Sequence, residues 1–124
     1  MAYAQHLARY TIADLALDTT PYTSHTTSSD ALWCGCPIVG LVDKNTDLFA
    51  ARVSGSVLTA TGLTDLITED LQQYEQRILQ LAQIPGELQS VRSRLHHARQ
   101  HAPMFDASRF TRDLEALYKS LLRV

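Results

Sequence analysis

His25, Thr26, Thr27 and Asp30 are the neighbouring side chains in this sequence that are best suited to bind a ligand. They stand where a helix is expected to begin, and the free N–H groups at the start of a helix attract anions. The imidazole and the two hydroxyls would add donors to the same anion. Asp30 follows one turn later, and because helical side chains lean toward the N-terminus, its carboxylate can reach a sugar diol beside a bound phosphate. The segment therefore predicts a nucleotide site.

A second interpretation of the same segment needs no ligand. The run from Thr27 to Asp30 loosely matches a capping box, with Asp in place of the usual Glu or Gln. Serine, threonine and aspartate are common wherever helices begin. Spacing alone leaves both the nucleotide site and the capped helix open.

The flanking segments would place this site at the edge of a parallel sheet. Apolar runs of strand character lie at 13–17 and 37–42, and a weaker one lies near 63–67. Helices are expected at 3–10 and 48–61, the second ending at Gly62. The apolar stripe of that second helix would consist of Phe49, Val53, Val57 and Leu58. This βαβαβ order over residues 1–67 indicates an α/β fold with right-handed crossovers.

The second half of the chain shows a helical period throughout. Helices are expected over 69–83 and 87–101, and an amphipathic helix follows Pro103, with Asp106 or Ser108 as its cap. Its apolar face would consist of Phe110, Leu114, Leu117 and Leu121. We therefore divide the single domain, residues 1–124, into a sheet part at 1–67 and a helical tail at 68–124.

Composition excludes several classes of protein. Hydrophobic residues make up 45% of the 124 residues and charged residues 19%, which is typical of a globular domain. The net charge of -2 and the absence of a dense basic stripe argue against a nucleic-acid partner. No apolar run approaches the ~20 residues that span a bilayer, and no signal peptide is recognisable. We expect a cytoplasmic protein without membrane contact.

The cysteines and histidines do not form a metal-binding pattern. Cys34 and Cys36 flank a glycine where a helix is expected to end against the next strand, a place that suits small buried thiols. His97 and His101 would share a helix face, but no carboxylate stands in register to complete a zinc site. Trp33 follows the apolar pattern of its helix and is expected in the core.

Short motifs in a fixed order run along the whole chain. The most specific is His25-Thr26-Thr27, followed by Asp30 and then Leu32-Trp33. The others are His6-Leu7-Ala8-Arg9, Ala13–Thr19, Gly35-Cys36-Pro37, Ala51-Arg52-Val53, Gly62-Leu63, Met104-Phe105-Asp106, Arg109-Phe110 and Asp113-Leu114-Glu115. Together they resemble the C-terminal catalytic lobe of O-linked N-acetylglucosamine transferases, above all the bacterial, SPINDLY-like members. The resemblance covers essentially the entire chain.

The resemblance implies a two-lobed glycosyltransferase of GT-B architecture. This family uses UDP-N-acetylglucosamine to modify Ser or Thr hydroxyls of acceptor proteins and needs neither a metal nor another cofactor. His6 would stack near the uracil with Arg9 beside it. The three residues His25, Thr26 and Thr27 would meet the diphosphate, and Asp30 would accept bonds from the ribose. The resemblance assigns no catalytic residue to this chain.

Departures from the family pattern limit what is expected of the chain. Ser24 and Ser28 stand where glycine is frequent, and Tyr3 stands where some relatives have lysine. The family's superhelical tetratricopeptide-repeat region, its N-terminal catalytic lobe and the first half of this lobe are not represented. We therefore expect the second half of a Rossmann-like, parallel-sheet lobe that contributes to UDP binding but is inactive alone. The alternative is a non-catalytic Rossmann-like interaction module.

A self-association is also expected from the first strand. The run Ala13–Leu17 would be central in a complete doubly wound sheet but unpaired on one side here. It is apolar apart from Asp14 and carries no lysine or proline to blunt an edge. Such a strand favours pairing with another copy of the chain.

Overall fold

A computed structural model describes residues 2–43, 45 and 47–122 of the chain. Its centre is a parallel sheet in the order β1-β2-β3, formed by Ala16–Leu17, Ile38–Leu41 and Ile67–Thr68. Ala16 pairs with Ile38, and Gly40 pairs with Ile67. The α/β class and the parallel sheet are therefore confirmed. All three strands are shorter than expected, the outer two most, because the segment before Ala16 bends away and residues 64–66 form a 3-10 turn.

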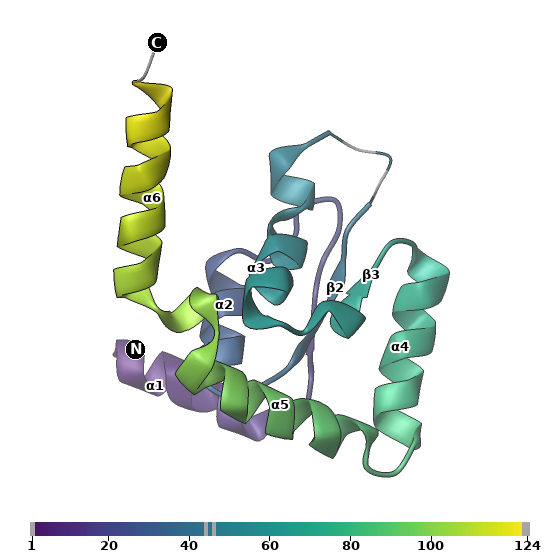
Figure 1. Cartoon of the computed structure of the whole chain (residues 1–124). Coiled ribbons are helices and arrows are strands. Elements are labelled where there is room, and N and C mark those ends of the chain that lie inside the picture. The colour runs from purple at the N-terminus through teal and green to yellow at the C-terminus, as the bar shows by residue number, and fades with distance from the viewer. Residues whose placement is uncertain (1, 44, 46, 123–124) are drawn as a thin grey trace.

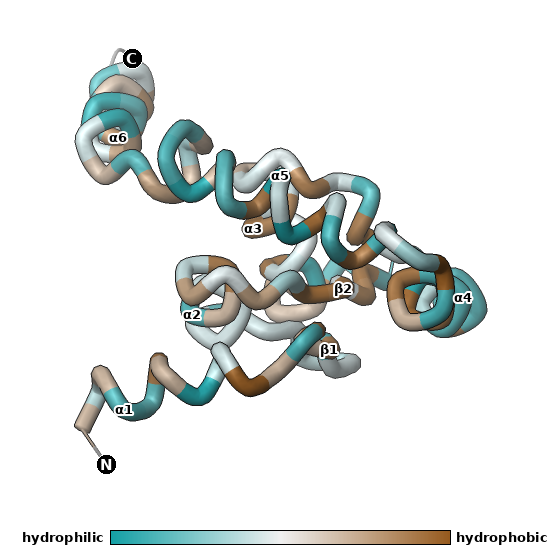
Figure 2. The backbone as a smooth tube through the Cα atoms, turned by 90° about the horizontal axis from the view of Figure 1, so that it is seen from below, coloured by the Kyte–Doolittle hydropathy of each residue, from teal (hydrophilic) through white to brown (hydrophobic). Residues whose placement is uncertain are grey.

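Helices surround this sheet (Figure 1). Helices α2 and α3 lie on one side of β2 and α4 lies on the other, while α5 runs along one end. Figure 2 shows α1 and α5 on opposite sides of α2. The bounds of the helices are α1 Tyr3–Ala8, α2 Thr26–Trp33, α3 Val53–Thr61, α4 Leu71–Gln83, α5 Glu87–His101 and α6 Ala107–Leu121.

The core joins the sheet to four helices. Its buried members come from α2, β2, α3, α4, α5 and the turn before β3: Leu32, Ile38, Val39, Leu58, Leu63, Leu66, Leu81, Val91 and Leu95. Helix α3 crosses β2 at very close range, since a Cβ on Gly40 would lie 2.8 Å from the Leu58 side chain. A Cβ on Gly55 would likewise lie 2.6 Å from Val42. Only glycine permits this approach of helix and strand.

This close packing corrects the expected stripe of α3. Phe49 is 76% exposed and belongs to a separate 3-10 turn rather than to the helix. The buried face of α3 consists of Ser54, Gly55, Leu58 and Thr61. Of the expected stripe, Leu58 is fully buried and Val57 packs against the core, and small residues fill the rest of the buried face because the helix lies so near the strand.

The ends of the helices follow the expected signals. Gly62 ends α3 with a left-handed φ of 80°, which glycine adopts without strain. Asp70 caps α4 by accepting the amide of Gln73 at 2.7 Å. Of the two candidate caps for α6, Asp106 is the one used, and it accepts the amide of Arg109 at 2.8 Å. The side chains therefore satisfy amides that the helices leave free.

Trp33 is the clearest error among the expected core residues. It is 50% exposed at the last position of α2, while its neighbour Leu32 is fully buried. The indole contacts Phe105, with ring centroids 5.6 Å apart, and the Arg99 guanidinium carbon lies 5.4 Å from its ring centroid. A large ring at the end of a helix reaches across the surface to the next element instead of pointing inward. Cys36, by contrast, is buried just before β2 as expected.

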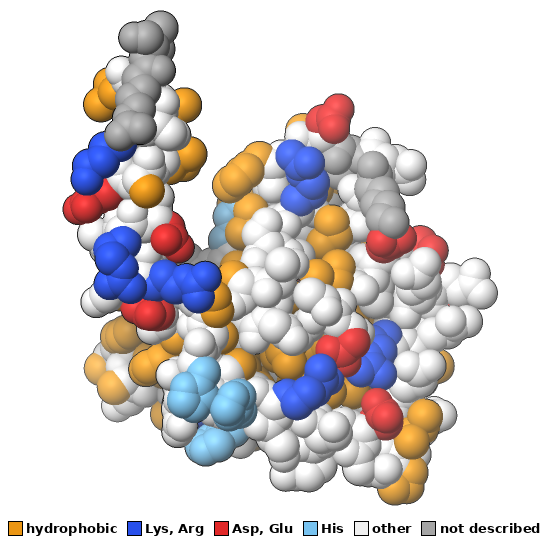
Figure 3. Space-filling view, in the orientation of Figure 1, with side chains coloured by type: hydrophobic (Ala, Val, Ile, Leu, Met, Phe, Trp, Pro, Cys, Tyr) orange, Lys and Arg blue, Asp and Glu red, His pale blue; other side chains and the backbone are white. Residues whose placement is uncertain are grey.

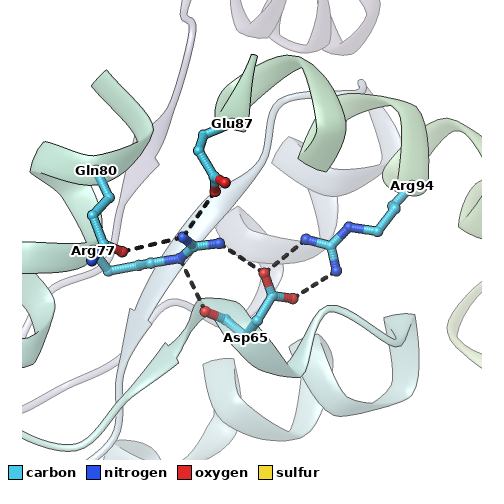
Figure 4. A network of polar contacts seen from close by, with 5 residues as sticks. All are labelled: Asp65, Arg77, Gln80, Glu87 and Arg94. Atoms are coloured by element: carbon cyan, nitrogen blue, oxygen red, sulfur yellow. Dashed lines mark hydrogen bonds and ion pairs between the residues drawn. The ribbon is translucent and has the colours of Figure 1, made fainter. Parts of the chain in front are cut away.

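A charged network braces the helical half (Figure 4). The Asp65 carboxylate, in the turn before β3, accepts bonds from Arg94 of α5 at 2.7 Å and from Arg77 of α4 at 2.8 Å. Arg77 also reaches Glu87 at the start of α5, at 3.3 Å. The network therefore ties α4 and α5 to the edge of the sheet.

Helix α6 projects away from the rest of the protein (Figures 1 and 3). The amphipathic face expected for it is present but unpacked, since Phe110 is 65% exposed and Leu121 is also 65% exposed. In the part of the chain that the structure describes, none of the helices combines the length and apolar character that a membrane crossing requires.

Candidate functional site

The site begins at the N-terminus of α2, which no side chain caps within the described residues. His25 is the residue before the helix, and Thr26 and Thr27 form its first turn. Ser28 does not cap the helix, because its buried hydroxyl donates to the carbonyls of Ser24 at 2.9 Å and His25 at 2.7 Å. Thr27, the cap of the expected capping box, lies inside the helix instead of before it, so the capping-box interpretation is wrong. The first amides of α2 and the positive end of its dipole stay available for an anion.

Aromatic contacts fix the position of His25 beside this helix end. Its ring stacks on Tyr22, with centroids 4.7 Å apart, and meets Phe49 edge-on at 6.1 Å. Nε2 lies 3.4 Å from the carbonyl oxygen of Ala50. Since a carbonyl only accepts, Nε2 carries the hydrogen of this contact. Tyr22 and Phe49 are 63% and 76% exposed, so His25 lies between two exposed aromatic rings.

A second group forms where α1 lies against α2. The hydroxyl of Tyr3 donates to Oδ1 of Asp30 at 3.2 Å, and Nε2 of His6 lies 3.7 Å from Oδ2. Arg9 approaches Nδ1 of the same imidazole at 3.2 Å. Because a guanidinium only donates, Nδ1 must accept and the hydrogen belongs on Nε2. Nε2 of His6 therefore faces Asp30 as a donor, in a long polar contact of 3.7 Å.

The Asp30 carboxylate contributes to the raised pKa values of two nearby tyrosines. The hydrogen bond to Asp30 raises the pKa of Tyr3 above its ordinary value. Burial raises the pKa of Tyr10, with a further contribution from the Asp30 charge. Both hydroxyls thus stay protonated at neutral pH and act as neutral donors. Tyr10 directs its own hydroxyl to the Thr27 carbonyl at 3.5 Å.

The structure thus divides the predicted site residues into two groups on one helix. His6, Arg9 and Asp30 meet on the α1 side, while His25, Thr26 and Thr27 gather at the helix start. Thr26 and Asp30 are four residues apart and share a face of α2, so the two groups adjoin. The sequence did not indicate Tyr10 or Tyr22. Their ring contacts join segments that only the fold brings together, and no local sequence pattern predicts these contacts.

The candidate site is an open surface rather than an enclosed cavity. A hollow of about 630 Å³ lies elsewhere, between the end of α3 and α5, and it is lined by Thr59, Leu63, Ser93, His97 and His101 among others. None of the predicted nucleotide-binding residues borders it. We therefore place the ligand chemistry at α2 and not in this hollow.

Among the described residues, no three His, Cys, Asp or Glu side chains lie together as a metal site would require. His97 and His101 have ring centroids 4.4 Å apart, and histidines gather on one face of the molecule (Figure 3).

The sequence of this chain is similar to sequences from one known protein family. The model of glycosyl transferase family 41 matches residues 1–114. The probable UDP-N-acetylglucosamine–peptide N-acetylglucosaminyltransferase SEC of Arabidopsis thaliana is 36% identical over 116 residues, covering 93% of this chain. A UDP-N-acetylglucosamine–peptide N-acetylglucosaminyltransferase of Caenorhabditis elegans is 32% identical over 116 residues, covering 94%. The chain spans only 12% and 10% of those two proteins.

A solved structure extends the likeness to the fold. A mutant of the O-GlcNAc transferase of Thermobaculum terrenum superposes with a TM-score of 0.88 at 35% sequence identity. The match covers 99% of this chain and 23% of that one. Sequence and fold lead to the same conclusion: the chain belongs to glycosyl transferase family 41.

Proposed function

We propose that this chain is the C-terminal part of a UDP-N-acetylglucosamine-dependent protein O-glycosyltransferase and supplies part of its UDP site. The observation that carries the proposal is the uncapped start of α2, with His25 held beside it and Asp30 one turn further on. This arrangement places an anion cradle and a carboxylate one helical turn apart on the same helix. The names of the relatives support the same donor.

The diphosphate would lie at the start of α2. A nucleoside diphosphate leaving group gains negative charge as the bond to the sugar breaks, and fixed donors that face it lower the barrier. The amides of Thr26 and Thr27, their hydroxyls and the His25 ring are such donors. In this proposal they replace a metal ion.

The nucleoside would lie toward α1. The flat imidazole of His6 and the guanidinium of Arg9 suit stacking against a uracil ring. Asp30 would accept bonds from the ribose hydroxyls. Tyr3 occupies one of the two carboxylate oxygens through a 3.2 Å bond, so a ribose hydroxyl would compete with or displace it.

The acceptor would be a Ser or Thr hydroxyl of a protein bound by other parts of a family member. The chain spans 23% of the solved relative. A transferase must also position the acceptor for attack, and proximity supplies much of the rate. We expect the 124 residues alone to transfer no N-acetylglucosamine from its UDP donor to peptides. Robust transfer by the purified chain would contradict this.

A titration of the isotope-labelled chain with UDP, followed by NMR, tests the proposed site. We expect binding in the millimolar range, about 4 kcal/mol, with the largest shifts at the amides of Thr26, Thr27 and Asp30. His25→Ala should weaken binding several-fold, whereas the matched control His97→Ala, on the exposed face of α5, should not. Shifts confined to other elements would refute the proposed site. Submicromolar affinity would instead show that the chain holds a complete site.

A self-association through β1 is a second proposal. β1 is an edge strand, and Leu17 is 54% exposed there. The expected strand over 13–17 is shortened to Ala16–Leu17, and Arg92 donates to the carbonyls of Ala13 and Asp14, at 3.4 and 3.1 Å. The pairing surface is therefore small. Sedimentation at high concentration should reveal a dimer that Ala16→Lys weakens, and a strict monomer would exclude it.

A further inference from the structure

Asp18 stands out among the buried residues of the chain. It follows β1 directly and is 6% exposed. The other buried polar side chains in the described part of the chain are neutral threonines and serines. A buried carboxylate is costly unless every oxygen finds donors, so its partners reveal what it holds in place.

Three backbone amides converge on this carboxylate. Oδ1 accepts the amides of Thr19 at 2.9 Å and Ser24 at 2.6 Å, and Oδ2 accepts the amide of Leu41 at 3.3 Å. The first two donors are the two ends of the loop that leads to α2. The third is the last residue of β2. Bonds to a carboxylate are shorter and stronger than neutral ones, as the 2.6 Å contact illustrates.

The backbone of Asp18 is held as firmly as its side chain. Its amide donates to the Val39 carbonyl at 3.2 Å, and its carbonyl accepts the hydroxyl of Tyr74 in α4 at 2.8 Å. Asp18 thus joins β1, β2, α4 and the loop at one point. Within the described residues it forms no ion pair, so amides alone satisfy the carboxylate.

Thr23 adds a second anchor to the same loop. Its amide and its hydroxyl both reach the Ala50 carbonyl, at 2.9 and 2.8 Å, and its hydroxyl accepts the amide of Ser54 at 3.3 Å. Ala50 is also the residue whose carbonyl contacts the His25 ring. The loop is therefore held at its start by the bond between Thr19 and Asp18, and at its end, just before α2, by the bonds of Thr23 and Ser24.

We infer that Asp18 is a positioning residue, which sets the loop at 19–24 so that the start of α2 faces the diphosphate. This inference rests on the proposed UDP site. Asn would turn its own NH₂ group toward one of the three amide donors and would offer the others only a neutral oxygen, which is a weaker acceptor than the carboxylate. The loop is then held less firmly, and His25, Thr26 and Thr27 move with it. The uracil and ribose contacts of α1 and Asp30 are not directly attached to this loop.

The test compares Asp18→Asn with Thr68→Val, a control that removes another buried hydrogen bond, the one to the Gly40 carbonyl. In NMR spectra of the full chain without ligand, Asp18→Asn should move the amide signals of Thr26 and Thr27. It should also speed hydrogen exchange at the Ser24 amide at least tenfold. Thr68→Val should do neither. Unchanged Thr26 and Thr27 signals in Asp18→Asn would overturn the inference, whether or not the chain binds UDP.

The ligand arm separates positioning from general damage. UDP affinity should fall at least tenfold in Asp18→Asn, while affinity for uridine, which lacks phosphates, stays within twofold. An equal loss for both ligands would overturn the positioning role. If wild type binds no UDP, the proposed function fails and the ligand-free spectra still decide the role of Asp18. If Asp18→Asn does not fold, Thr23→Val must show the same UDP-over-uridine loss, and its absence overturns the inference.

Discussion

Two carboxylates of this chain gather several side chains each, and they do so in different ways. Asp65 receives two guanidinium groups in bonds of 2.7 to 2.8 Å (Figure 4). Asp30 receives a tyrosine hydroxyl at 3.2 Å and lies 3.7 Å from the His6 imidazole. Asp65 is saturated by full positive charges at short range. Asp30 has longer contacts, with a hydroxyl and an imidazole.

The difference distinguishes Asp65, which braces the helices, from Asp30, which we propose to bind the ribose. The arginine bonds to Asp65 hold three segments together, and the Arg94 hydrogen bonds are the main reason that the pKa of Asp65 lies below its ordinary value. A hydroxyl from a ligand has nothing to gain there. Asp30 keeps acceptor capacity that its present partners use poorly, so ligand hydroxyls can replace them. We infer that saturation by cations, rather than the number of contacts, tells the two roles apart.

The largest expected effect is on ligand binding by Asp30→Ala. The ribose hydroxyls would lose a charged acceptor, and hydrogen bonds to charged groups contribute about 1.5–3 kcal/mol, which lowers UDP affinity tenfold or more. The free energy of unfolding should change by less than about 1 kcal/mol, because only long contacts are lost. Calorimetry or NMR titration, with urea unfolding alongside, measures both. A variant that unfolds readily yet binds UDP normally when folded would reverse the assignment.

Asp65→Ala should show the opposite profile. It breaks the bidentate contact with Arg94 and the contact with Arg77. Because Asp65 is 40% exposed, solvent screens part of the attraction that is lost. We expect about 1–2 kcal/mol less stability in urea unfolding. UDP affinity should stay within twofold of wild type. A stability equal to that of wild type would mean that the network does not contribute to the free energy of unfolding.

The brace should also weaken in acid. The folded pKa of Asp65 lies below its ordinary 3.8, so its stabilisation is complete above that pH and is lost as the pH falls through the folded value. Below about pH 4, wild type should therefore lose stability more steeply than Asp65→Ala. Urea midpoints measured at several pH values provide the slopes. Parallel curves for the two proteins would show that Asp65 does not contribute to acid unfolding.

Tyr3→Phe should have the smallest effect. It removes the donor on Asp30 and leaves that oxygen free for a ribose hydroxyl. We expect UDP affinity to stay level or rise slightly, and the melting temperature to change little. A clear fall in affinity would mean that Tyr3 itself contacts the nucleotide.

Short sequence patterns predicted the helix and the helix ends that depend only on neighbouring residues. The helix over 87–101, the left-handed Gly62 and the cap at Asp106 all follow from short patterns, and the structure has each of them. Trp33 and Phe49 were wrong because burial depends on which elements approach one another. The distance between α3 and β2 decides the packing there, and the sequence does not encode it in any local period.

The candidate site shows the same division. The His25-Thr26-Thr27 motif predicted an anion site at a helix start. The family resemblance added His6 and Arg9 to the predicted site. The contacts of Asp30 with Tyr3 and His6 cross 27 and 24 residues of chain. Asp18 was also missed as a functional residue, since nothing in its neighbourhood reveals that amides from β2 and from the loop converge on it.

The central claim is that Asp30 binds ligand hydroxyls whereas Asp65 holds helices together. The most direct test is the ratio of UDP dissociation constants for Asp30→Asn and Asp65→Asn, measured side by side on folded protein. Both changes neutralise one carboxylate of the same length, so the overall charge is matched. We predict that Asp30→Asn binds UDP at least tenfold more weakly than Asp65→Asn. Equal affinities, or weaker binding by Asp65→Asn, would contradict the account.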